Sequence, residues 1–404
     1  MSLQIDNTAI KSAAKRLEVI GNNVANANTV GFKGAEFVES LAWAMSTETG
    51  ATSVGGRQSF SQGDVSQSNN PLDIAISGAG FFRIENGDKV AYTRSGQFSL
   101  NKDGEIVNIA GDKLTGFQAD PESGMIKSGN PVPLIISQAN DAPKPTSKAT
   151  LELMLDSRSP VITAPFSASD PTTYTHSTTS TVYTAQGKEV NVQTFYVKTA
   201  DNDWDLYSWA GGAEPAGKLG SLTFGTDGLV ASTTTYDPAT DTSTVAPTKG
   251  AFAITIDGTP MSLDLGDATQ YGSKFTVRVS QDGRGVGQLL NYSVGEDGMI
   301  TVRYNNGNSK VLGQVVLANF RSLNGLQPVG NSQWLESAAS GSAEINQPGV
   351  GVLGSLKAAS TESSNIDLTV EMIKMISAQR SFQAAAEMLR RQDESMQALN
   401  NIGR

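Results

Sequence analysis

The chain of 404 residues carries 30 Lys and Arg against 40 Asp and Glu, which gives a net charge of -10, and it contains no cysteine. The acidic balance argues against nucleic acid as a partner because the positive field that collects phosphates is missing, and the lack of cysteine excludes disulfides, thiolate catalysis and cysteine-bound metal. The AVILMFWYC residues reach 38%, which predicts globular domains, about two or three by length, and without a run of about 18 apolar residues we expect no membrane insertion.

The N-terminal start has neither the basic region nor the apolar region of a Sec signal peptide. Taken alone, this start favours a cytoplasmic protein. It equally fits a protein that a dedicated secretion channel exports whole.

The first 33 residues predict an amphipathic helix because apolar side chains recur at steps of three and four. The residues of this face are Ile10, Ala13, Leu17, Ile20, Val24 and Ala27. Gly21, Asn22 and Asn23 interrupt the pattern, and such residues cost a helix about 0.5–1 kcal/mol each relative to alanine. A packing partner is therefore expected to hold this helix, since short isolated helices are marginal in water.

Residues 34–70 are predicted to be a linker or an extended arm. From about residue 45 they are rich in Ser, Thr, Gly, Gln and Asn, with few large apolar groups. From Leu72 onward, short apolar alternations cut by turn residues predict antiparallel β-structure. Asn86-Gly87 and Asp103-Gly104 are hairpin signals because these pairs supply positive φ at the turn.

A Pro-rich connection, 131–145, precedes a second β-zone, 146–281, with Ser/Thr runs and hairpin signals at Asp227-Gly228 and Asp257-Gly258. After this zone the first pattern resumes, and its turns are expected at Asp297-Gly298, Asn306-Gly307 and Asn324-Gly325. The second zone is therefore interpreted as an outer β-domain inserted into an inner one, which comprises 71–145 and 282–357.

The last segment, 358–404, predicts a second amphipathic helix with the same steps of three and four. Its apolar positions are Leu368, Met372, Met375, Phe382, Ala386, Leu389 and Met396, with Gln379, Asp393 and Asn400 completing the pattern. Asn365 or Ser364 is expected as the N-cap, with Asp367 near the first turn, where it suits the helix dipole.

The predicted architecture is mainly β with α-helical termini, in a nested multidomain order of helix, β, inserted β, β, helix. The terminal helices, 1–33 and 358–404, form a coiled-coil-like inner-core domain, and two antiparallel β-domains lie outside it. This order is expected to place both termini at one end and the insertion at the other.

No catalytic, cofactor-binding or metal-ligating residue is predicted, so the chain is not expected to be an enzyme. Residues 349–354 match a dinucleotide fingerprint, but Pro348 precedes it and no long helix follows at once. His176 is the only histidine and is interpreted as an exposed strand or loop residue, so neither a triad nor a histidine metal cluster can form. Trp204, Tyr207 and Trp209 could stack on carbohydrate, but core or interface aromatics are the commoner reading.

The N-terminal segment carries a recognisable motif, residues 17–26 (Leu-Glu-Val-Ile-Gly-Asn-Asn-Val-Ala-Asn) followed by 29–33 (Thr-Val-Gly-Phe-Lys). This motif resembles the N-terminal signature of the bacterial flagellar rod and hook protein family. Residues 71–76, 80–82 and 92–98 resemble the inner β-domain of that family, and 311–320, 364–368 and 375–380 resemble its return half. One departure is 381–385 (Ser-Phe-Gln-Ala-Ala), where the family usually has Tyr-Gln-Ala-Asn after the Gln-Arg pair.

The large inserted zone makes the hook members the closest match, because rod members are shorter. The resemblance implies a structural subunit that polymerises with itself into a flexible helical tube, transmits torque from rod to filament and conducts later subunits. The two apolar helix faces then form the inter-subunit seam. Implied partners are the distal rod, the hook cap, the hook-filament junction protein and the type III export gate, with an extracellular location in the hook and export without a cleaved Sec signal.

Phe37 and Leu41 resemble the Phe-x-x-x-apolar pattern by which early flagellar substrates engage the export gate; an ordinary i,i+4 helical pair is the competing reading. Two alternatives to the hook remain open. A distal rod or other axial component would share the helical ends but form a straight assembly. A secreted β-rich adhesin would pair its helices within one chain.

Overall fold

The computed structural model describes residues 2–402 apart from 39–55, 88, 122, 128, 211–216, 238–241, 247–250, 257 and 266. The chain divides into two compact units. Unit 1 comprises Met1–Gln138, Leu290–Arg303 and Ser309–Arg404, and unit 2 comprises Ala139–Leu289 and Tyr304–Asn308. The expected insertion, 146–281, lies within unit 2, which also takes in 139–145, 282–289 and 304–308 of the expected inner β-domain. Both terminal helices and the rest of that domain fall in unit 1.

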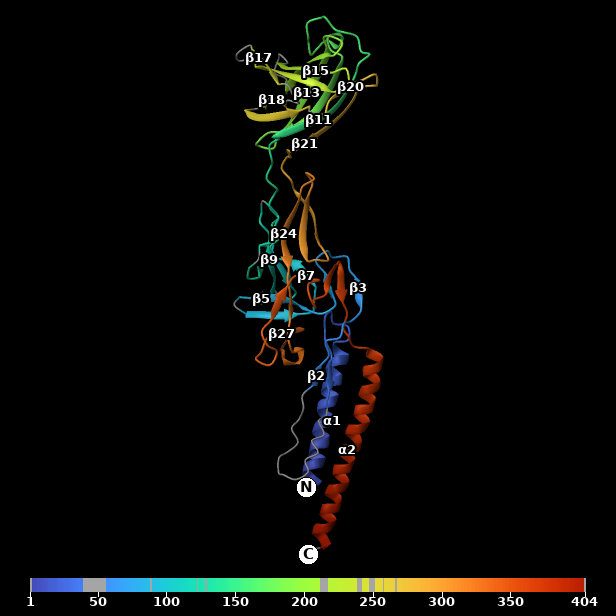
Figure 1. Cartoon of the computed structure of the whole chain (residues 1–404). Helices are drawn as coiled ribbons and strands as arrows, with labels where there is room; N and C mark the ends of the chain where they lie inside the picture. Colours follow the sequence, from blue (N-terminus) through green and yellow to red (C-terminus); the bar gives the residue numbers. More distant parts are fainter. Residues whose placement is uncertain are drawn as a thin grey trace. The chain divides into compact units, whose positions relative to one another are not determined.

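Both predicted terminal helices are present, α1 at Ser2–Ala25 and α2 at Leu368–Ile402, and they lie side by side (Figure 1). Helix α1 ends earlier than the apolar pattern predicts, so Ala27 lies beyond it. The Asn26 side chain donates to the Asn22 carbonyl at 3.0 Å, and the chain turns from there to Gly31. At α2 the predicted N-cap is wrong, because Asp367 accepts from the Thr369 and Val370 backbone N–H groups at 2.8 and 3.2 Å.

Gly21 offers a direct test of how α1 is held. Apart from the adjoining residues and backbone of the helix itself, no heavy atom of the described residues lies within 4 Å of the position that a Cβ would take there, so Gly21→Ala adds a methyl group into open space. The exchange is expected to stabilise α1 by about 0.5–1 kcal/mol because alanine restricts the unfolded chain. Native-state hydrogen exchange on α1 measures the gain.

The matched comparison for Gly21→Ala is Gly96→Ala, whose Cβ would lie 1.7 Å from the Ile74 carbonyl oxygen. That exchange should destabilise unit 1, because backbone atoms would have to move apart. Equal effects of the two exchanges would contradict this account of packing.

Unit 1 is built on one large sheet with the strand order β22-β23-β24-β9-β5-β6-β27-β26. Its strands are β22 (Leu289–Val294), β23 (Met299–Tyr304), β24 (Ser309–Val315), β9 (Lys113–Gln118), β5 (Phe81–Asn86), β6 (Lys89–Thr93), β27 (Gln333–Leu335) and β26 (Gln327–Gly330), with β7 (Phe98–Leu100), β8 (Ile106–Asn108), β10 (Val132–Pro133), β25 (Leu317–Asn319) and β28 (Glu344–Asn346) attached. The registered strand pairs of this sheet are antiparallel, and Gly87, Gly104, Gly298 and Gly307 adopt positive φ at the predicted turns. Asn324-Gly325 also lies in a turn, as predicted, which is the 3-10 turn Leu323–Gly325.

Three further strand pairs of unit 1 join segments from the two halves of the chain or pair the segments before and after residues 39–55. They are β1 (Ala35–Phe37) with β2 (Gly56–Gln58), β4 (Ile74–Ser77) with β29 (Ser355–Ala358), and β3 (Val65–Gln67) with β30 (Ser360–Glu362). Three of these strands, β1, β2 and β3, lie within the segment expected as a linker. An aromatic cluster of Phe60, Phe81, Phe320 and Trp334 packs edge to face beside them.

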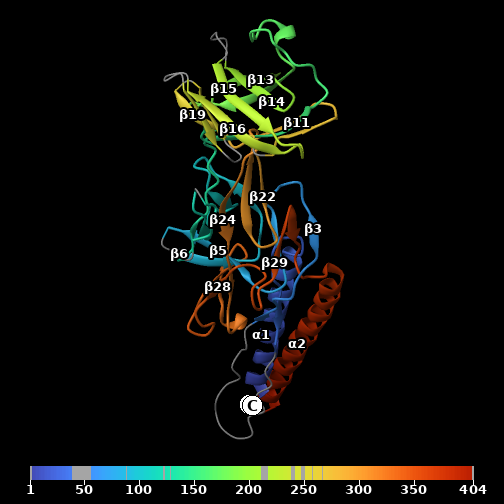
Figure 2. The ribbon, with the colours of Figure 1, turned by 45° about the horizontal axis from the view of Figure 1, so that its top comes forward.

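Unit 2 contains a six-stranded meander and a five-stranded sheet, and Figure 2 shows the meander strands side by side. The meander runs through β12 (His176–Tyr183), β13 (Glu189–Lys198), β14 (Asp203–Ala210), β15 (Gly217–Phe224), β16 (Val230–Asp237) and β17 (Thr242–Ala246), after the short 3-10 turn Pro171–Thr173. The second sheet holds β18 (Ala251–Ile256), β19 (Thr259–Asp264), β11 (Lys148–Asp156), β20 (Thr269–Tyr271) and β21 (Thr276–Gln281). Apolar side chains of both sheets form one core, with Trp204, Leu222 and Phe252 at most 1% exposed.

One feature of unit 2 departs from the antiparallel pattern. Strand β11 pairs in parallel with β19 and β20, whereas it pairs antiparallel with β21. A parallel pair needs a long crossover connection, and the whole meander lies between β11 and β19 in sequence. Alternation within each strand cannot reveal this pairing.

Candidate functional site

Helices α1 and α2 pack against each other within one chain. Among the side chains that the structure describes, the buried and half-buried positions of α2 recur at steps of three and four, and Ile20 is the most buried apolar residue of α1. These α2 positions are Glu371, Met375, Ala378, Phe382, Ala385 and Leu389. Part of the apolar helix surface is therefore already covered inside a single subunit.

The predicted seam residues divide between two sides of α2. Met375, Phe382 and Leu389 are half-buried, whereas Leu368, Met372 and Ala386 are exposed, and Met396 lies outside the described side chains. On α1, Ile20 is buried and Ile10, Ala13, Leu17 and Val24 are half-buried; Ala27 is half-buried in the turn that follows. Whether these faces join neighbouring subunits stays a prediction.

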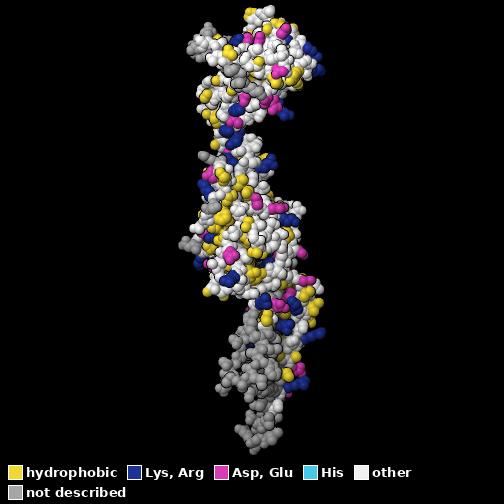
Figure 3. All heavy atoms as spheres, viewed as in Figure 1, with side chains coloured by type: hydrophobic (Ala, Val, Ile, Leu, Met, Phe, Trp, Pro, Cys, Tyr) yellow, Lys and Arg dark blue, Asp and Glu magenta, His cyan; other side chains and the backbone are white. Residues whose placement is uncertain are grey.

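An apolar stripe remains uncovered on α2. Leu368, Met372 and Ile376 follow one another at steps of four, and their exposed fractions are 40%, 52% and 52%. We call these three residues the exposed stripe. Figure 3 shows hydrophobic side chains along the described part of α2, between charged ones. Such a stripe on a helix needs a further partner to leave water.

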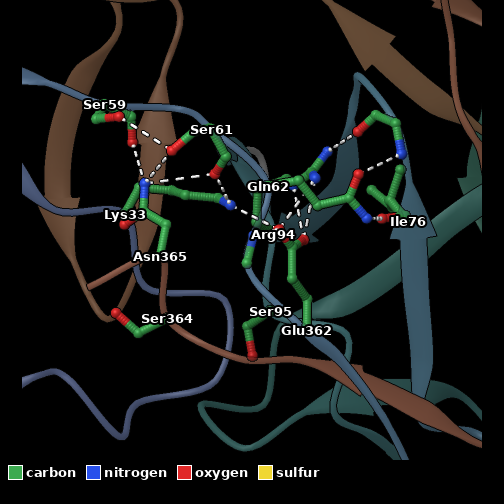
Figure 4. Close-up of polar contacts among 12 residues, drawn as sticks. Lys33, Ser59, Ser61, Gln62, Ile76, Arg94, Ser95, Glu362, Ser364 and Asn365 are labelled. Atoms are coloured by element: carbon green, nitrogen blue, oxygen red, sulfur yellow. Dashed lines mark hydrogen bonds and ion pairs between the residues drawn. The ribbon is translucent and has the colours of Figure 1, made fainter. Parts of the chain in front are cut away.

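A buried charge cluster joins the two halves of the chain near the helix ends (Figure 4). Glu362, at the end of β30, is fully buried and accepts from Lys33 Nζ at 2.6 Å. Arg94 binds the same carboxylate in a fork, with Nε 3.0 Å from Oε2 and Nη2 3.2 Å from Oε1. The Gly63 backbone N–H also donates to Oε1, at 3.0 Å.

Both cations of this cluster also donate hydrogen bonds to backbone carbonyls. Lys33 Nζ donates to the Ser61 carbonyl at 2.7 Å, and Arg94 Nη1 donates to the Gly78 and Gly80 carbonyls at 2.9 and 2.6 Å. Burial lowers the pKa of the Lys33 ammonium below its usual value, while the hydrogen bond and the charge of Glu362 oppose that shift. The Glu362 carboxylate thus offsets the cost of burying two cations, Lys33 and Arg94.

The Asn365 side-chain amide and a backbone hydrogen bond fix the chain around the cluster. Asn365 accepts from the Gly34 N–H at 2.9 Å and donates to the Ser59 carbonyl at 2.9 Å. The N–H of Gly31 donates to the Glu362 carbonyl at 2.8 Å. Gly31 has φ +70°, and a Cβ there would lie 2.4 Å from the Ser95 nitrogen, so this tight approach requires glycine.

A second polar contact links the helices themselves. The buried Asn23 side chain donates to the Ala35 carbonyl at 2.8 Å and accepts from the Ala35 N–H at 3.0 Å. It also donates to Glu371 Oε2 at 3.4 Å. Lys374 Nζ donates to Glu371 Oε1 at 2.7 Å. Asn23, which by its propensity weakens the helix, therefore fixes α1 to α2 and β1.

Sequence reasoning missed Glu362 and Glu371. Lys33 and Arg94 lie in motifs that the resemblance singled out, but Glu362 stands in a Ser/Thr-rich stretch with no apolar pattern around it. A single carboxylate in such a stretch normally indicates a solvated edge strand. Only the pairing of β30 with β3 brings it to the cations.

The remaining sequence candidates lie apart from the helix pair. Phe37 ends β1 opposite Gly56, so the competing reading of a helical pair is wrong, and Leu41 lies outside the described residues. Residues 349–354 form turns that lead into β29, not into a helix. Trp204 is a core residue whose Nε1 donates to Gln270 Oε1 at 3.0 Å. Within the described ranges, no three His, Asp or Glu residues gather as metal ligands.

The expectation that His176 is exposed is wrong. It begins β12, is half-buried, and stacks on Phe275 with ring centroids 4.3 Å apart. The register of β12 on β13 explains this, because His176 pairs with the buried Tyr196. Burial lowers the pKa of His176 below its usual value, and the nearby charge of Asp156 partly opposes the shift.

Unit 2 is expected to lose stability in mild acid through His176. Because its folded pKa is lowered, the unfolded chain binds the proton first, so the stabilisation is complete above the unfolded pKa of about 6.5 and declines as pH falls below it. Proton NMR titration of the only imidazole measures the folded pKa directly. His176→Phe, which keeps the stacking, should flatten the pH dependence of unfolding between about pH 7 and 5; a folded pKa at or above the unfolded value would contradict the prediction.

Comparison with known proteins places the whole chain beside flagellar proteins. Four sequence models match in succession: "Flagella basal body rod protein" over residues 3–33, "Flagellar hook protein FlgE/F/G D1 domain" over 75–141, "Flagellar basal body protein FlaE D2 domain" over 154–284, and "Flagellar basal body rod FlgEFG protein C-terminal" over 357–402. No helix among residues that the structure describes is long and apolar enough to cross a membrane.

Individual relatives match from end to end. The chain is 35% identical to the flagellar hook protein FlgE of Salmonella typhimurium over 100% of both chains, and 34% identical to that of Escherichia coli over 98% of both. Identity to the flagellar hook protein FlgE of Borreliella burgdorferi is 26%, over 98% of both chains. A crystal structure of Helicobacter pylori flagellar hook protein FlgE2 aligns with a TM-score of 0.49 and 13% identity, covering 72% of this chain and 99% of that chain.

Proposed function

This chain belongs to the flagellar hook protein family, and from that premise we propose that it polymerises into the flexible helical tube that transmits torque from rod to filament. It is a structural component and not an enzyme. The tube also conducts later subunits. End-to-end identity with hook proteins of similar length supports this role.

Among individual residues, those of the exposed stripe of α2 give the strongest support for this proposal. Removing apolar surface from water contributes about 25 cal/mol per Å², and Leu368, Met372 and Ile376 keep 40–52% of their surface in water after α1 has packed on α2. A second copy of the chain covers the stripe. If the contact between copies does not close a ring, the product is an open helical filament.

The proposed place of each segment in the tube follows the nested order of the chain. Segments 1–33 and 358–404 form the inner core of the tube, and 71–145 with 282–357 forms the inner β-domain. Residues 34–70 connect these two parts, and 146–281 forms the outer domain; the D2 match over 154–284 supports that placement. The proposed seam between copies comprises the exposed stripe of α2, whereas buried and half-buried positions of the predicted faces, such as Ile20 and Met375, are covered within the subunit.

The finer assignments of partner and location rest on the family. The proposed partners are other copies of the chain, the distal rod, the hook cap, the hook-filament junction protein and the type III export gate, with Phe37 and Leu41 as the gate motif. The hook lies outside the cell, and we propose that the chain reaches it through the flagellar export channel without a cleaved Sec signal.

Electron microscopy of the purified full chain, concentrated in a salt that strengthens apolar burial, tests the proposal. Curved tubes are the expected result. Straight rods would favour the distal rod alternative, and a chain that stays monomeric at high concentration would contradict assembly altogether.

A further inference from the structure

Methionine is the only oxidisable sulfur residue in this chain, with ten methionines and no cysteine. The described side chains among them differ widely in exposure. Met372 is 52% exposed and lies in the middle of the exposed stripe, with Leu368 and Ile376 four residues away on either side. A thioether packs as an apolar group, whereas its sulfoxide is polar.

We propose that Met372 is a redox modification site whose oxidation by a peroxide in the unassembled subunit blocks the contact between copies. The proposal rests on the assembly role of the exposed stripe given above. Met372 is part of the proposed contact between copies, and before assembly the same side chain is exposed to oxidant in the surroundings. Its oxidation state would therefore control whether the contact forms.

The chemistry needs only hydrogen peroxide as co-reactant. A lone pair on Met372 Sδ attacks one peroxide oxygen, the S–O bond forms, and the O–O bond breaks. The departing hydroxide takes the proton from the oxygen now bound to sulfur, which leaves the sulfoxide and one water. Sulfur is oxidised by two electrons and the peroxide is reduced by two, and methionine sulfoxide reductases reverse the change.

Oxidation should weaken assembly because the new S=O group loses its hydration when a second copy covers the exposed stripe. The neighbours of Met372 along the stripe, Leu368 and Ile376, are hydrocarbon side chains that donate no hydrogen bond. Burying a polar oxygen without a donor should raise the concentration needed for polymerisation about tenfold or more. The isolated subunit should stay folded, because the side chain is already half in water.

The chain supplies matched controls for this modification. Met125 is 71% exposed but lies in unit 1 outside both helices, and Met261 is 4% exposed in the core of unit 2. Met388 is also exposed on α2, at 70%, so all proteins in the experiment carry Met388→Leu. In this background, Met372→Leu removes the sulfur but keeps the apolar volume, and Met125→Leu removes the sulfur of a still more exposed methionine elsewhere.

The experiment treats purified subunits with hydrogen peroxide, maps sulfoxides by peptide mass spectrometry, and then measures polymerisation by sedimentation. Met372 and Met125 should oxidise readily and Met261 should not. Polymerisation should be impaired in the parent and in Met125→Leu, retained in Met372→Leu, and restored by reductase treatment. Peroxide added after polymerisation should leave Met372 largely unmodified while it still oxidises Met125.

The outcomes separate this inference from the assembly role itself. If untreated parent subunits fail to polymerise, the proposed function is wrong. If they polymerise, and polymerisation is unaffected although Met372 is oxidised, the modification proposal is overturned and the assembly role stands. Peroxide sensitivity that persists in Met372→Leu, or equal oxidation of Met372 before and after polymerisation, overturns it as well.

Discussion

Glu362→Gln is expected to lower the free energy of unfolding of unit 1 by about 3–5 kcal/mol, because it leaves two buried cations without their anion. The side chains of Lys33 and Arg94 are 0% and 4% exposed, so solvent cannot take over the role of the carboxylate. Native-state hydrogen exchange with mass spectrometry measures the change, since it reports each unit separately where a single two-state fit would not apply.

Two further variants make this test specific. Lys33→Met leaves Arg94 and Glu362 balanced, so it should cost only about 1–2 kcal/mol, mainly for the hydrogen bond lost by the Ser61 carbonyl. Glu105→Gln breaks a pair of similar length, Lys113 to Glu105 at 2.6 Å, whose side chains are 40% and 15% exposed. Its cost should stay within about 1 kcal/mol. Similar losses for Glu362→Gln and Glu105→Gln would contradict the argument from burial.

Ile376→Lys is expected to abolish polymerisation while leaving the subunit folded. In the isolated chain Ile376 is 52% exposed, so a lysine there reaches water easily. In an assembly that covers the exposed stripe, the exchange loses about 1.5–3 kcal/mol of apolar burial and adds an unpaired buried charge. The concentration needed for polymerisation should therefore rise more than about a hundredfold.

Ser381→Lys is the control for that variant. Five residues separate it from Ile376, which places it about 140° away around the helix, and Ser381 is exposed. Sedimentation and electron microscopy measure polymers, and circular dichroism confirms that both subunits keep their helices. Polymers of Ile376→Lys at the concentration that suffices for the unchanged chain would show that the stripe is not the contact.

In the two β-regions, the sequence predicted the positions of turns better than it predicted which strands pair with each other. Asn-Gly and Asp-Gly pairs act within a few residues, so they located turns such as the one at Gly104 before any strand partner was known. The parallel pairing of β11 with β19, by contrast, depends on a crossover of more than one strand. Nothing within either strand encodes which neighbour it will meet.

The sequence by itself determined that this protein has a helix at each end and glycine-punctuated β-structure between them, and its motifs identified the family. These properties depend on periodicity and on turn chemistry, which act over one or two turns of chain. Only the tertiary structure decided which side of α2 meets α1, because α2 has apolar residues on more than one side and its period suits several faces. It likewise decided that Glu362 is buried between Lys33 and Arg94, since the burial of a charge is set by partners hundreds of residues away along the chain.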